Sequence, residues 1–239
     1  MSSITLQPSN IINQTLTPVS SSFPSSLLPV LKEVMQVKEN IPATLSSKIP
    51  VISIGGCPGV GKTHITRLFS QELTERGLSC VVIHFDDWTN PAENRQNGYF
   101  NLQGIHEFFQ ALLSGTRVIN KPTSAEFVDE YGQETLDLRK TDIVLFEGLS
   151  ALSAKDPINY FSYCDFGIFV DAPREDITHW KRTRPCTVPR TDEEFAQHMV
   201  AVFGYHEENI EPFKKNANWV IEKDRSHNYF PKQNSAQSM

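Results

Sequence analysis

A phosphate-binding motif of the form G-x-x-x-x-G-K-[ST] occupies residues 56–63. Glycines at this spacing let backbone N–H groups turn inward around phosphate oxygens, and a helix that begins at the motif adds its positive N-terminal end. The Lys62 ammonium would reach the β- and γ-phosphates of a nucleotide, and the Thr63 hydroxyl would bind Mg²⁺. The residues expected to form this nucleotide site are Gly56, Cys57, Pro58, Gly59, Val60, Gly61, Lys62, Thr63 and His64. The alternative is a plain strand-to-helix turn without phosphate, which is disfavoured because the motif follows an apolar strand and opens an amphipathic helix.

Two acidic residues stand where predicted strands end. Asp86 follows the run Ser79–Phe85, and Glu147 follows Asp142–Phe146. Since the carboxyl ends of parallel strands face the ligand crevice, both carboxylates are expected beside the phosphate loop. We expect Asp86 to accept the proton of a reacting hydroxyl and to contact Mg²⁺ through water, and Glu147 to bind Mg²⁺ together with Thr63. The alternatives are a turn-capping role for Asp86 and a salt bridge at the sheet edge for Glu147.

The densest basic stretch of the chain surrounds Pro185 and Pro189. It consists of Lys181, Arg182, Arg184 and Arg190. Such a stretch suits a lid that closes over a nucleotide, with Arg184 and Arg190 meeting the charge of the transferring γ-phosphate. The alternative is that these cations complement the C-terminal end of a helix, which accounts for the first three but not for Arg190.

Strand and helix patterns alternate between Ile49 and about Asp224. Short apolar runs predict strands at Pro50–Ile54, Ser79–Phe85, Asp142–Phe146, Asp165–Val170 and Ala217–Ile221. Apolar residues at helical spacing predict helices at Thr63–Arg76, Gly104–Ser114, Pro173–Arg184 and Thr191–Phe213. Strands separated by helices imply right-handed βαβ units. The predicted fold is therefore α/β, a P-loop NTPase-type three-layer sandwich with a central parallel sheet and a kinase-like lid.

The absence of a guanine-binding motif excludes GTPases from the possible classes of phosphate-loop protein. GTPases read guanine with N-K-x-D, whereas the sequence at 120–123 is Asn-Lys-Pro-Thr, with Thr in place of the Asp. A small kinase remains, since it needs a base for the acceptor hydroxyl, an acid for Mg²⁺ and cations around the phosphates.

The order of the later motifs resembles the uridine kinase, phosphoribulokinase and pantothenate kinase superfamily over about Ile49 to Asp224. After the phosphate loop come FDDW at 85–88, FEGLSAL at 146–152, FVDAP at 169–173, the basic stretch and IEPFKKNANWVIE at 210–222. The resemblance implies that Asp86 is the catalytic aspartate of the family's D-x-[FY] motif and that Glu147 is the acid of its E-G motif. Residues 170–173, with Trp180 and Arg184, look most like bacterial pantothenate kinases, and residues 211–217 look more like uridine kinases.

Three departures from the uridine kinase pattern concern the acceptor. Residues 122–125 read Pro-Thr-Ser-Ala in place of Pro-x-Tyr-Asp, the lid pair Arg-Asp reads Arg184-Pro185, and an acidic sugar-binding position corresponds to Gly104 or Gln103. Uridine and cytidine are therefore disfavoured, and pantothenate, a riboside, a sugar phosphate or glycerate is expected. Acceptor recognition is expected from Asn97–Gln103 and from Ser124–Tyr131, the second through Glu126, Asp129 and Tyr131.

The predicted function is that of an ATP-dependent phosphotransferase that moves the γ-phosphate to an alcohol group of a small metabolite, with ATP and Mg²⁺ as cofactors. The alternative is a nucleotide-binding regulator or degenerate kinase that acts through a protein partner, with a Ser-rich tail as the contact. Retention of Lys62, Thr63, Asp86 and Glu147 together disfavours it, because a binder without turnover does not need all four. A third hypothesis, a kinase of macromolecules, has no basic surface for RNA to support it.

Composition sets the frame. The chain has 239 residues, with Lys+Arg 22 against Asp+Glu 28 and a formal net charge of −6. These numbers predict one domain and disfavour nucleic-acid binding. We expect a flexible Ser/Pro-rich tail over 1–47, interrupted by a short helix around Leu27–Val37, a P-loop kinase domain over 48–224 and a polar tail over 225–239.

The length of the apolar runs and the number of cysteines predict where the protein acts in the cell. No apolar run reaches the length of a membrane span, so no membrane partner is expected, and a homo-oligomer is compatible with the sequence. Four scattered cysteines favour a reducing compartment, with the cytoplasm as the default location. Cys57 lies inside the phosphate loop, where a helix N-terminus would depress the pKa of its thiol. Redox inhibition at Cys57 is therefore one hypothesis, and a small residue tolerated in the loop is the alternative.

Overall fold

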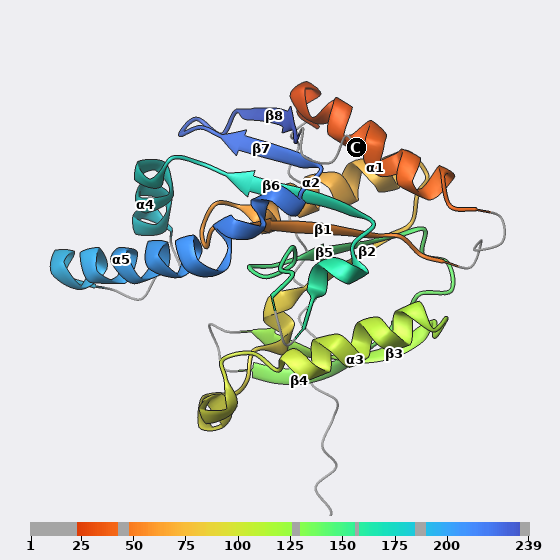
Figure 1. The fold of residues 1–239 in the computed structure, drawn as a ribbon, viewed down its shortest axis with the longest axis horizontal. Helices are drawn as coiled ribbons and strands as arrows, with labels where there is room; N and C mark the ends of the chain where they lie inside the picture. Colours follow the sequence, from red (N-terminus) through yellow and green to blue (C-terminus); the bar gives the residue numbers. More distant parts are fainter. Residues whose placement is uncertain (1–22, 43–47, 126–129, 156–157, 185–189, 235–239) are drawn as a thin grey trace, which may run out of the picture.

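A six-stranded sheet forms the centre of the protein, which we describe from a computed structural model over residues 23–42, 48–125, 130–155, 158–184 and 190–234. The strand order is β2-β5-β1-β6-β7-β8 (Figure 1). The strands are β1 (Val51–Gly56), β2 (Cys80–His84), β5 (Ile143–Glu147), β6 (Phe166–Asp171), β7 (Trp219–Lys223) and β8 (Tyr229–Gln233). The first five in this order pair in parallel, whereas β8 runs antiparallel to β7. The predicted α/β fold with a central parallel sheet is confirmed, and its last edge strand is antiparallel.

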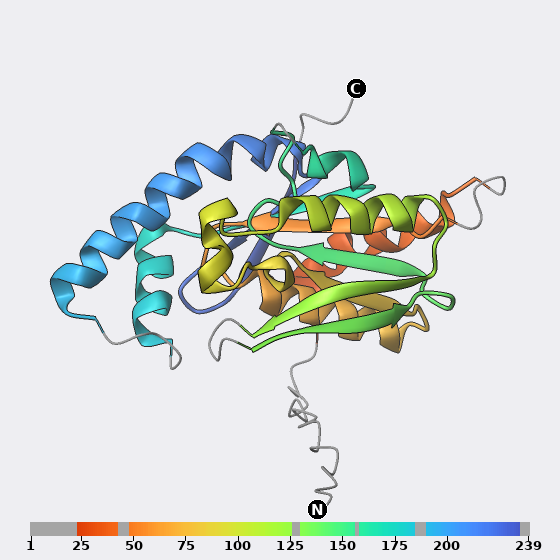
Figure 2. The ribbon, with the colours of Figure 1, turned by 90° about the horizontal axis from the view of Figure 1, so that it is seen from below.

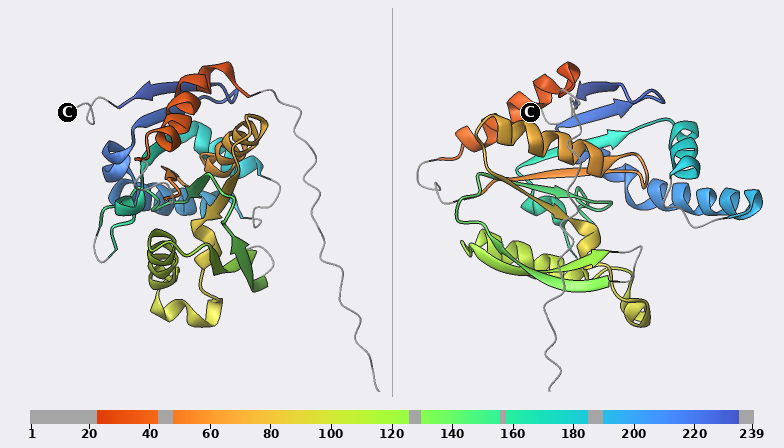
Figure 3. Two further views of the ribbon diagram at one scale, coloured as in Figure 1. Left: turned by 90° about the vertical axis from the view of Figure 1, so that its right-hand side faces the viewer. Right: turned by 180° about the vertical axis from the view of Figure 1, so that it is seen from behind.

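Two apolar layers sandwich the sheet because its inner strands are buried on both faces. On β1 and β5, Ile52 and Leu145 face one cluster, and the intervening Val51, Val144 and Phe146 face the other. Helices α1 (Leu28–Glu39) and α2 (Lys62–Glu75) cover the first face (Figure 3), and α3 (Leu102–Leu113) covers the second. This arrangement gives the three predicted layers.

Helices α4 (Arg174–Thr183) and α5 (Asp192–Asn209) extend beyond the sheet on the side where β6 and β7 end (Figure 1). A capping box starts α5, in which the Thr191 side chain accepts from the Glu194 N–H and the Glu194 carboxylate accepts from the Thr191 N–H at 2.8 Å. The predicted helix over 191–213 is divided in the structure. It ends at Asn209 and is followed by the 3₁₀ segment η6 (Glu211–Asn216), because Pro212 cannot continue an α-helix.

An antiparallel hairpin of β3 (Val118–Ala125) and β4 (Glu130–Asp137) forms a separate two-stranded sheet that the sequence reading did not predict. It runs beside α3 (Figure 2) and contacts the 3₁₀ segment η3 (Phe85–Trp88). The remaining 3₁₀ segments are η1 (Ser25–Leu27), η4 (Ala92–Asn97) and η5 (Tyr160–Tyr163). The sequence pattern does not predict the hairpin because its strands are mostly polar, with Ile119 as the one buried apolar residue among those described in it.

Both chain ends differ from the tails expected at 1–47 and 225–239. The expected short helix is α1, and its buried Val30, Leu31 and Val34 belong to the same apolar cluster as α2. Glu33 on α1 also accepts a hydrogen bond from the indole N–H of Trp219 at 2.9 Å. At the other end, residues 229–233 form β8 of the sheet. Leu27, Val30, Leu31 and Val34, at helical spacing, are enough to pack this segment against the domain, although its composition is otherwise that of a tail.

Candidate active site

The phosphate loop connects β1 to α2 through three glycines with left-handed backbone geometry. Gly56, Gly59 and Gly61 have φ of 145°, 88° and 101°. A Cβ on Gly56 would lie under 3.0 Å from the carbonyl oxygen of Val170, so no other residue fits there. The loop is anchored from below by Cys57 and Val60, both fully buried. These constraints hold the loop in one conformation at the start of α2, where backbone N–H groups are unpaired.

Lys62 lies inside this loop. Its Nζ donates to the carbonyl oxygens of Gly56 at 3.1 Å and Cys57 at 3.2 Å, and the residue is 8% exposed. Burial lowers the pKa of Lys62 below its usual value, and the charges of Glu147 and Asp86 offset part of that shift. The ammonium is therefore held at the cradle, with both predicted acids within electrostatic reach.

The carboxylate of Glu147 makes hydrogen bonds with two side chains, one from α2 and one from β2. The Thr63 hydroxyl donates to Glu147 Oε1 at 2.9 Å, and His84 Nδ1 lies 2.7 Å from the same oxygen. Burial acts to raise the pKa of Glu147, but the hydrogen bond with His84 and the charge of Lys62 outweigh it, so that the pKa lies below its usual value. The same hydrogen bond raises the pKa of His84. Glu147 is thus an ionised carboxylate at the loop.

This donor set fits Mg²⁺. A carboxylate and a hydroxyl lie together at the phosphate cradle, and Mg²⁺ in such sites takes few protein ligands beside phosphate oxygens and water. Among the described residues there is no cluster of three or more His, Cys, Asp or Glu side chains of the kind that encloses a metal ion. The arrangement therefore suits a metal that arrives with a nucleotide.

Asp86 lies on η3 directly after β2, at the edge where Glu147 ends β5. Its neighbours hold the segment in place, since Phe85 is 1% and Trp88 2% exposed. The Phe85 ring packs edge-on against Phe100 at 4.9 Å and Tyr160 at 5.4 Å between centroids. Asp86 itself is exposed, and its charge acts on Lys62. Two buried aromatic residues thus present an exposed acid beside the phosphate loop.

The basic stretch is divided between two roles. Arg182 pairs with Asp192 and lies over the ring of Phe195, so that it ties α4 to α5. The Lys181 stem lies over the phosphate loop, because a Cβ on Gly59 would meet its Cγ at 2.7 Å. Burial lowers the pKa of Lys181, and the charges of Arg184 and Arg190 lower it further.

Arg184 and Arg190 are thus near Lys181, and both are exposed. The prolines of the predicted lid lie at 185–189, outside the described residues.

The comparisons with known proteins point to one kind of fold. No protein-family model matches the chain. A pantothenate kinase of Leifsonia xyli subsp. xyli (strain CTCB07) is 26% identical over 214 residues, covering 74% of this chain and 66% of that protein. A pantothenate kinase of Corynebacterium glutamicum (strain R) is 31% identical over 150 residues, covering 56% and 46%. The chain thus spans between about half and two thirds of the length of these relatives.

Solved structures agree with this result. D-glycerate 3-kinase from Cryptococcus neoformans var. grubii superposes with a TM-score of 0.65 at 11% identity, covering 87% of this chain and 99% of that one. A possible uridine kinase from Bacillus stearothermophilus gives 0.57 at 20% identity, covering 81% and 98%. The fold is that of the P-loop small-molecule kinases. The resemblance predicted from the motif order is therefore confirmed.

A cavity of about 870 Å³ opens beside the acids of this P-loop kinase fold. Phe85, next to Asp86, forms part of its wall, as do Leu149 and Ser150, which follow the Glu147-Gly148 turn. Of the segment Asn97–Gln103 expected to recognise an acceptor, residues 98–103 line it. From the second expected segment, Tyr131 is exposed on β4 and does not line the cavity, whereas Glu126 and Asp129 lie outside the described residues.

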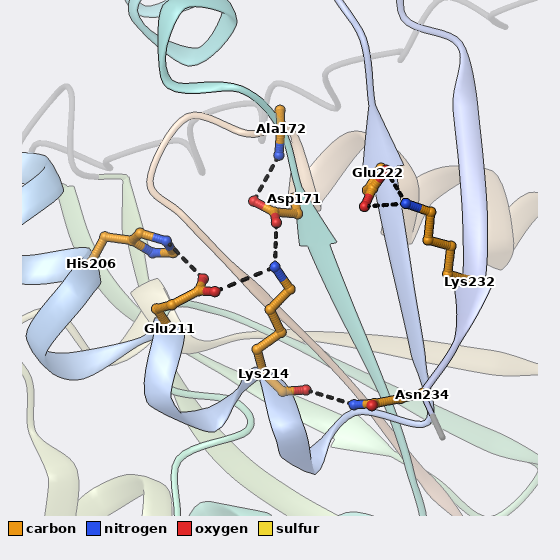
Figure 4. Close-up of polar contacts among 8 residues, drawn as sticks. All are labelled: Asp171, Ala172, His206, Glu211, Lys214, Glu222, Lys232 and Asn234. Carbon is orange, nitrogen blue, oxygen red and sulfur yellow. Dashed lines mark hydrogen bonds and ion pairs between the residues drawn. The ribbon is translucent and has the colours of Figure 1, made fainter. Parts of the chain in front are cut away.

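A chain of polar contacts connects the end of α5 to the sheet (Figure 4), and α5 supplies Tyr205 and Asn209 to the cavity wall. Lys214 on η6 donates to Asp171 at the end of β6 at 2.5 Å and lies 3.3 Å from Glu211. Glu211 in turn lies 3.2 Å from His206 Nε2. The network therefore connects α5 to the end of β6, next to the phosphate loop.

Two lysines that the sequence does not predict as site residues, Lys121 and Lys223, contact elements of the site. Lys121, 4% exposed, joins η3 to the hairpin by ion pairs of 2.6 Å with Asp87 and with Glu134. The residues around Lys121 show only that the guanine-binding motif is absent. No pattern of neighbouring residues predicts that a lysine will be buried.

Lys223, at the end of β7, donates to the Val60 carbonyl oxygen at 3.3 Å and lies 4.0 Å from the Trp180 ring centroid. Burial lowers the pKa of Lys223 to about 8. Lys223 lies beside Gly61 because of the order of the strands in the sheet, and this order cannot be predicted from the local sequence.

Cys57 departs from its expected chemistry. The thiol is fully buried, and burial raises its pKa to about 11, more than the charges of Lys62 and Lys181 lower it. The expectation of a depressed pKa at the helix N-terminus is wrong, because desolvation exceeds the dipole effect. Cys57 is therefore a buried loop residue and not a reactive thiol.

Proposed function

We propose that the protein is an ATP-dependent phosphotransferase that moves the γ-phosphate to an alcohol group of a small metabolite. The observation that carries the proposal is the meeting of Lys62, Thr63 and Glu147 at one phosphate loop. The charge of Asp86 acts on Lys62, and the preceding residue, Phe85, lines a cavity of small-molecule size. The pantothenate kinases among the relatives and the small-molecule kinases among the solved structures support the same reaction type.

Each residue would act through its position. The loop N–H groups and Lys62 would hold the β- and γ-phosphates of ATP. Asp86 would accept the proton of the acceptor hydroxyl as it attacks. Arg184 and Arg190, beside Lys181 over the loop, would meet the charge that develops on the transferring group.

Thr63 and Glu147 would hold Mg²⁺, and Asp86 would contact it through water. Held by these residues, Mg²⁺ would supply positive charge that offsets the charge of the phosphates. His84 supports this role through the same Glu147 oxygen, because a hydrogen bond from a neighbouring ring fixes the orientation of a ligating carboxylate.

We propose a class of acceptor, the small-molecule alcohols, and not a single compound. The curated relatives are pantothenate kinases, which makes pantothenate the first alcohol to test. None of the described helices has the length and apolar character needed to cross a membrane. We infer a cytoplasmic location from the cysteines, of which Cys57, Cys80 and Cys164 are free thiols.

The test is ADP release from Mg·ATP with pantothenate, uridine, cytidine, nicotinamide riboside, glycerate and ribulose 5-phosphate as acceptors. Asp86→Asn should retain ATP binding and lose transfer by about 100-fold or more. Asp137→Asn, which changes an exposed acid on the outer strand β4, is the matched control and should transfer at the wild-type rate. Tight ATP binding without turnover of any acceptor would instead support a nucleotide-binding regulator that acts through a protein partner.

A further inference from the structure

The cavity beside Asp86 has a wall chemistry that discriminates between acceptors. Amide side chains of Asn90, Asn94, Asn101, Gln103 and Asn209 line it, together with aromatic and aliphatic surface. Among the described residues of the wall there is no carboxylate. Each amide can donate through its NH₂ group, and none of the described wall residues carries a negative charge that would repel an anion.

Lys155 is the charged residue of this wall among those described. Its ammonium donates to Asn209 Oδ1 on α5 at 2.9 Å, and its backbone N–H donates to the buried Ser153 hydroxyl at 3.2 Å. Lys155 makes no ion pair with any residue that the structure describes, unlike Lys121 and Lys214. A lysine held by a neutral amide keeps its full charge available to a ligand.

A second cation, Arg95, contacts two residues of the cavity wall. Arg95 on η4 donates from Nε to the backbone oxygen of Asn90 at 3.2 Å, and its guanidinium lies 4.6 Å from the Tyr99 ring centroid. Asn90 and Tyr99 both line the cavity. The cavity thus has one cation in its wall and a second in contact with wall residues, and this charge favours a negative ligand.

We propose that the acceptor carries an anionic group, a carboxylate or a phosphate, and that Lys155 binds it, an inference that rests on the phosphotransferase function proposed above. The cation binds the anion through charge-assisted hydrogen bonds, with the amides as further donors. The reacting hydroxyl is then directed toward Asp86 from the same cavity. Lys155 is a specificity-determining residue, and neutral nucleosides lack the group that it binds.

The experiment measures acceptor binding and transfer separately. Binding of pantothenate, glycerate and ribulose 5-phosphate is compared with that of uridine and cytidine by calorimetry, with Mg²⁺ and a non-hydrolysable ATP analogue present. The variants are Lys155→Gln, Lys155→Arg and Lys32→Gln. The last removes the same charge from an exposed position on α1, a helix that contributes no residue to the cavity wall.

At least one anion should bind about tenfold or more tightly than either nucleoside. Lys155→Gln should remove that preference and raise KM for the anion far more than it lowers kcat, whereas Lys155→Arg and Lys32→Gln should preserve it. The carboxylate and phosphate probes decide which anion is preferred.

Three results overturn the inference: equal binding of nucleosides and anions, an unchanged preference in Lys155→Gln, or no binding of any anion. The two proposals fail separately. Anion binding that depends on Lys155, without any transfer, supports the anion site and contradicts the phosphotransferase function. Transfer that is insensitive to Lys155→Gln contradicts the anion site and supports the function.

Discussion

A Cβ added to Gly148 would lie under 3.0 Å from the Cβ of Phe85, so that the turn after Glu147 and the start of η3 touch with no room for a side chain between them. Glu147 and Asp86 each stand one residue away from this contact. The two acids assigned to the metal and to the acceptor hydroxyl are therefore held at a fixed separation by a glycine and a buried phenylalanine.

Gly148→Ala should therefore disturb both acids. The added methyl must displace Phe85, at a cost in unfolding free energy of about 1–3 kcal/mol, as for other overpacked sites. The phosphotransfer rate should fall more than ATP affinity, because the phosphate loop itself is untouched. Urea unfolding and single-turnover kinetics measure the two effects. Gly204→Ala on α5 is the control, since its added Cβ would meet no atom outside its own stretch of helix within 4 Å. It should raise the unfolding free energy by up to about 1 kcal/mol, as expected for a glycine inside a helix, and leave the transfer rate near wild type.

Lys121→Met should uncouple the hairpin from η3. The change leaves Asp87 without its buried cation, and loss of one partner from a buried pair costs about 3 kcal/mol of unfolding free energy. Since η3 carries Asp86, transfer should fall while nucleotide binding persists. Lys232→Met removes an exposed pair with Glu222 and should cost under about 1 kcal/mol. Equal effects of the two substitutions would contradict the positioning role of Lys121.

Lys223 gives the unliganded protein a pH dependence with a defined sign. Its pKa falls from the usual 10.5 to about 8 in the folded chain because burial disfavours the charge. Between these two values the unfolded chain holds a proton that the folded chain has lost, so folding stability rises with pH by up to about 3 kcal/mol. That contribution is lost as the pH falls through about 8.

Lys223→Met lacks this titration. The unfolding free energy of the variant minus that of the wild type should therefore decrease from about pH 7 to about pH 10. Urea titrations at several pH values measure the difference directly, which cancels the contribution of every other group. A difference that stays constant over this range would show that the ammonium is not desolvated beside the loop.

Cys57 should resist alkylation in the folded protein. With a pKa of about 11 and a fully buried thiol, its thiolate fraction near pH 8 is about one in a thousand. Iodoacetamide followed by peptide mass mapping should label Cys57 only after unfolding in urea. Rapid labelling of the native chain that ATP blocks would contradict this prediction and restore the redox hypothesis.

The sequence by itself determined the features that are local. The phosphate loop is defined by eight consecutive residues, and the five parallel strands and four helices by the periodicity of apolar side chains, with boundaries shifted by a few residues. Asp86 and Glu147 were found because a strand and the acid that ends it are adjacent in the chain. Each of these inferences needed only neighbouring residues, for which backbone geometry fixes the spacing.

Only the tertiary structure decided which distant side chains meet. Thr63 and Glu147 are 84 residues apart in sequence and share a hydrogen bond, and the contact of Gly148 with Phe85 joins two further segments. The hairpin, the Lys121 bridge and the packing of α1 also depend on which surfaces remain to be covered once the sheet has formed. Lys155 shows the same limit, because a lysine in a polar loop acquires a role only when α5 places the Asn209 amide beside it at the cavity wall. Strand order and the burial of charge are properties of the whole fold, and no stretch of the chain encodes them alone.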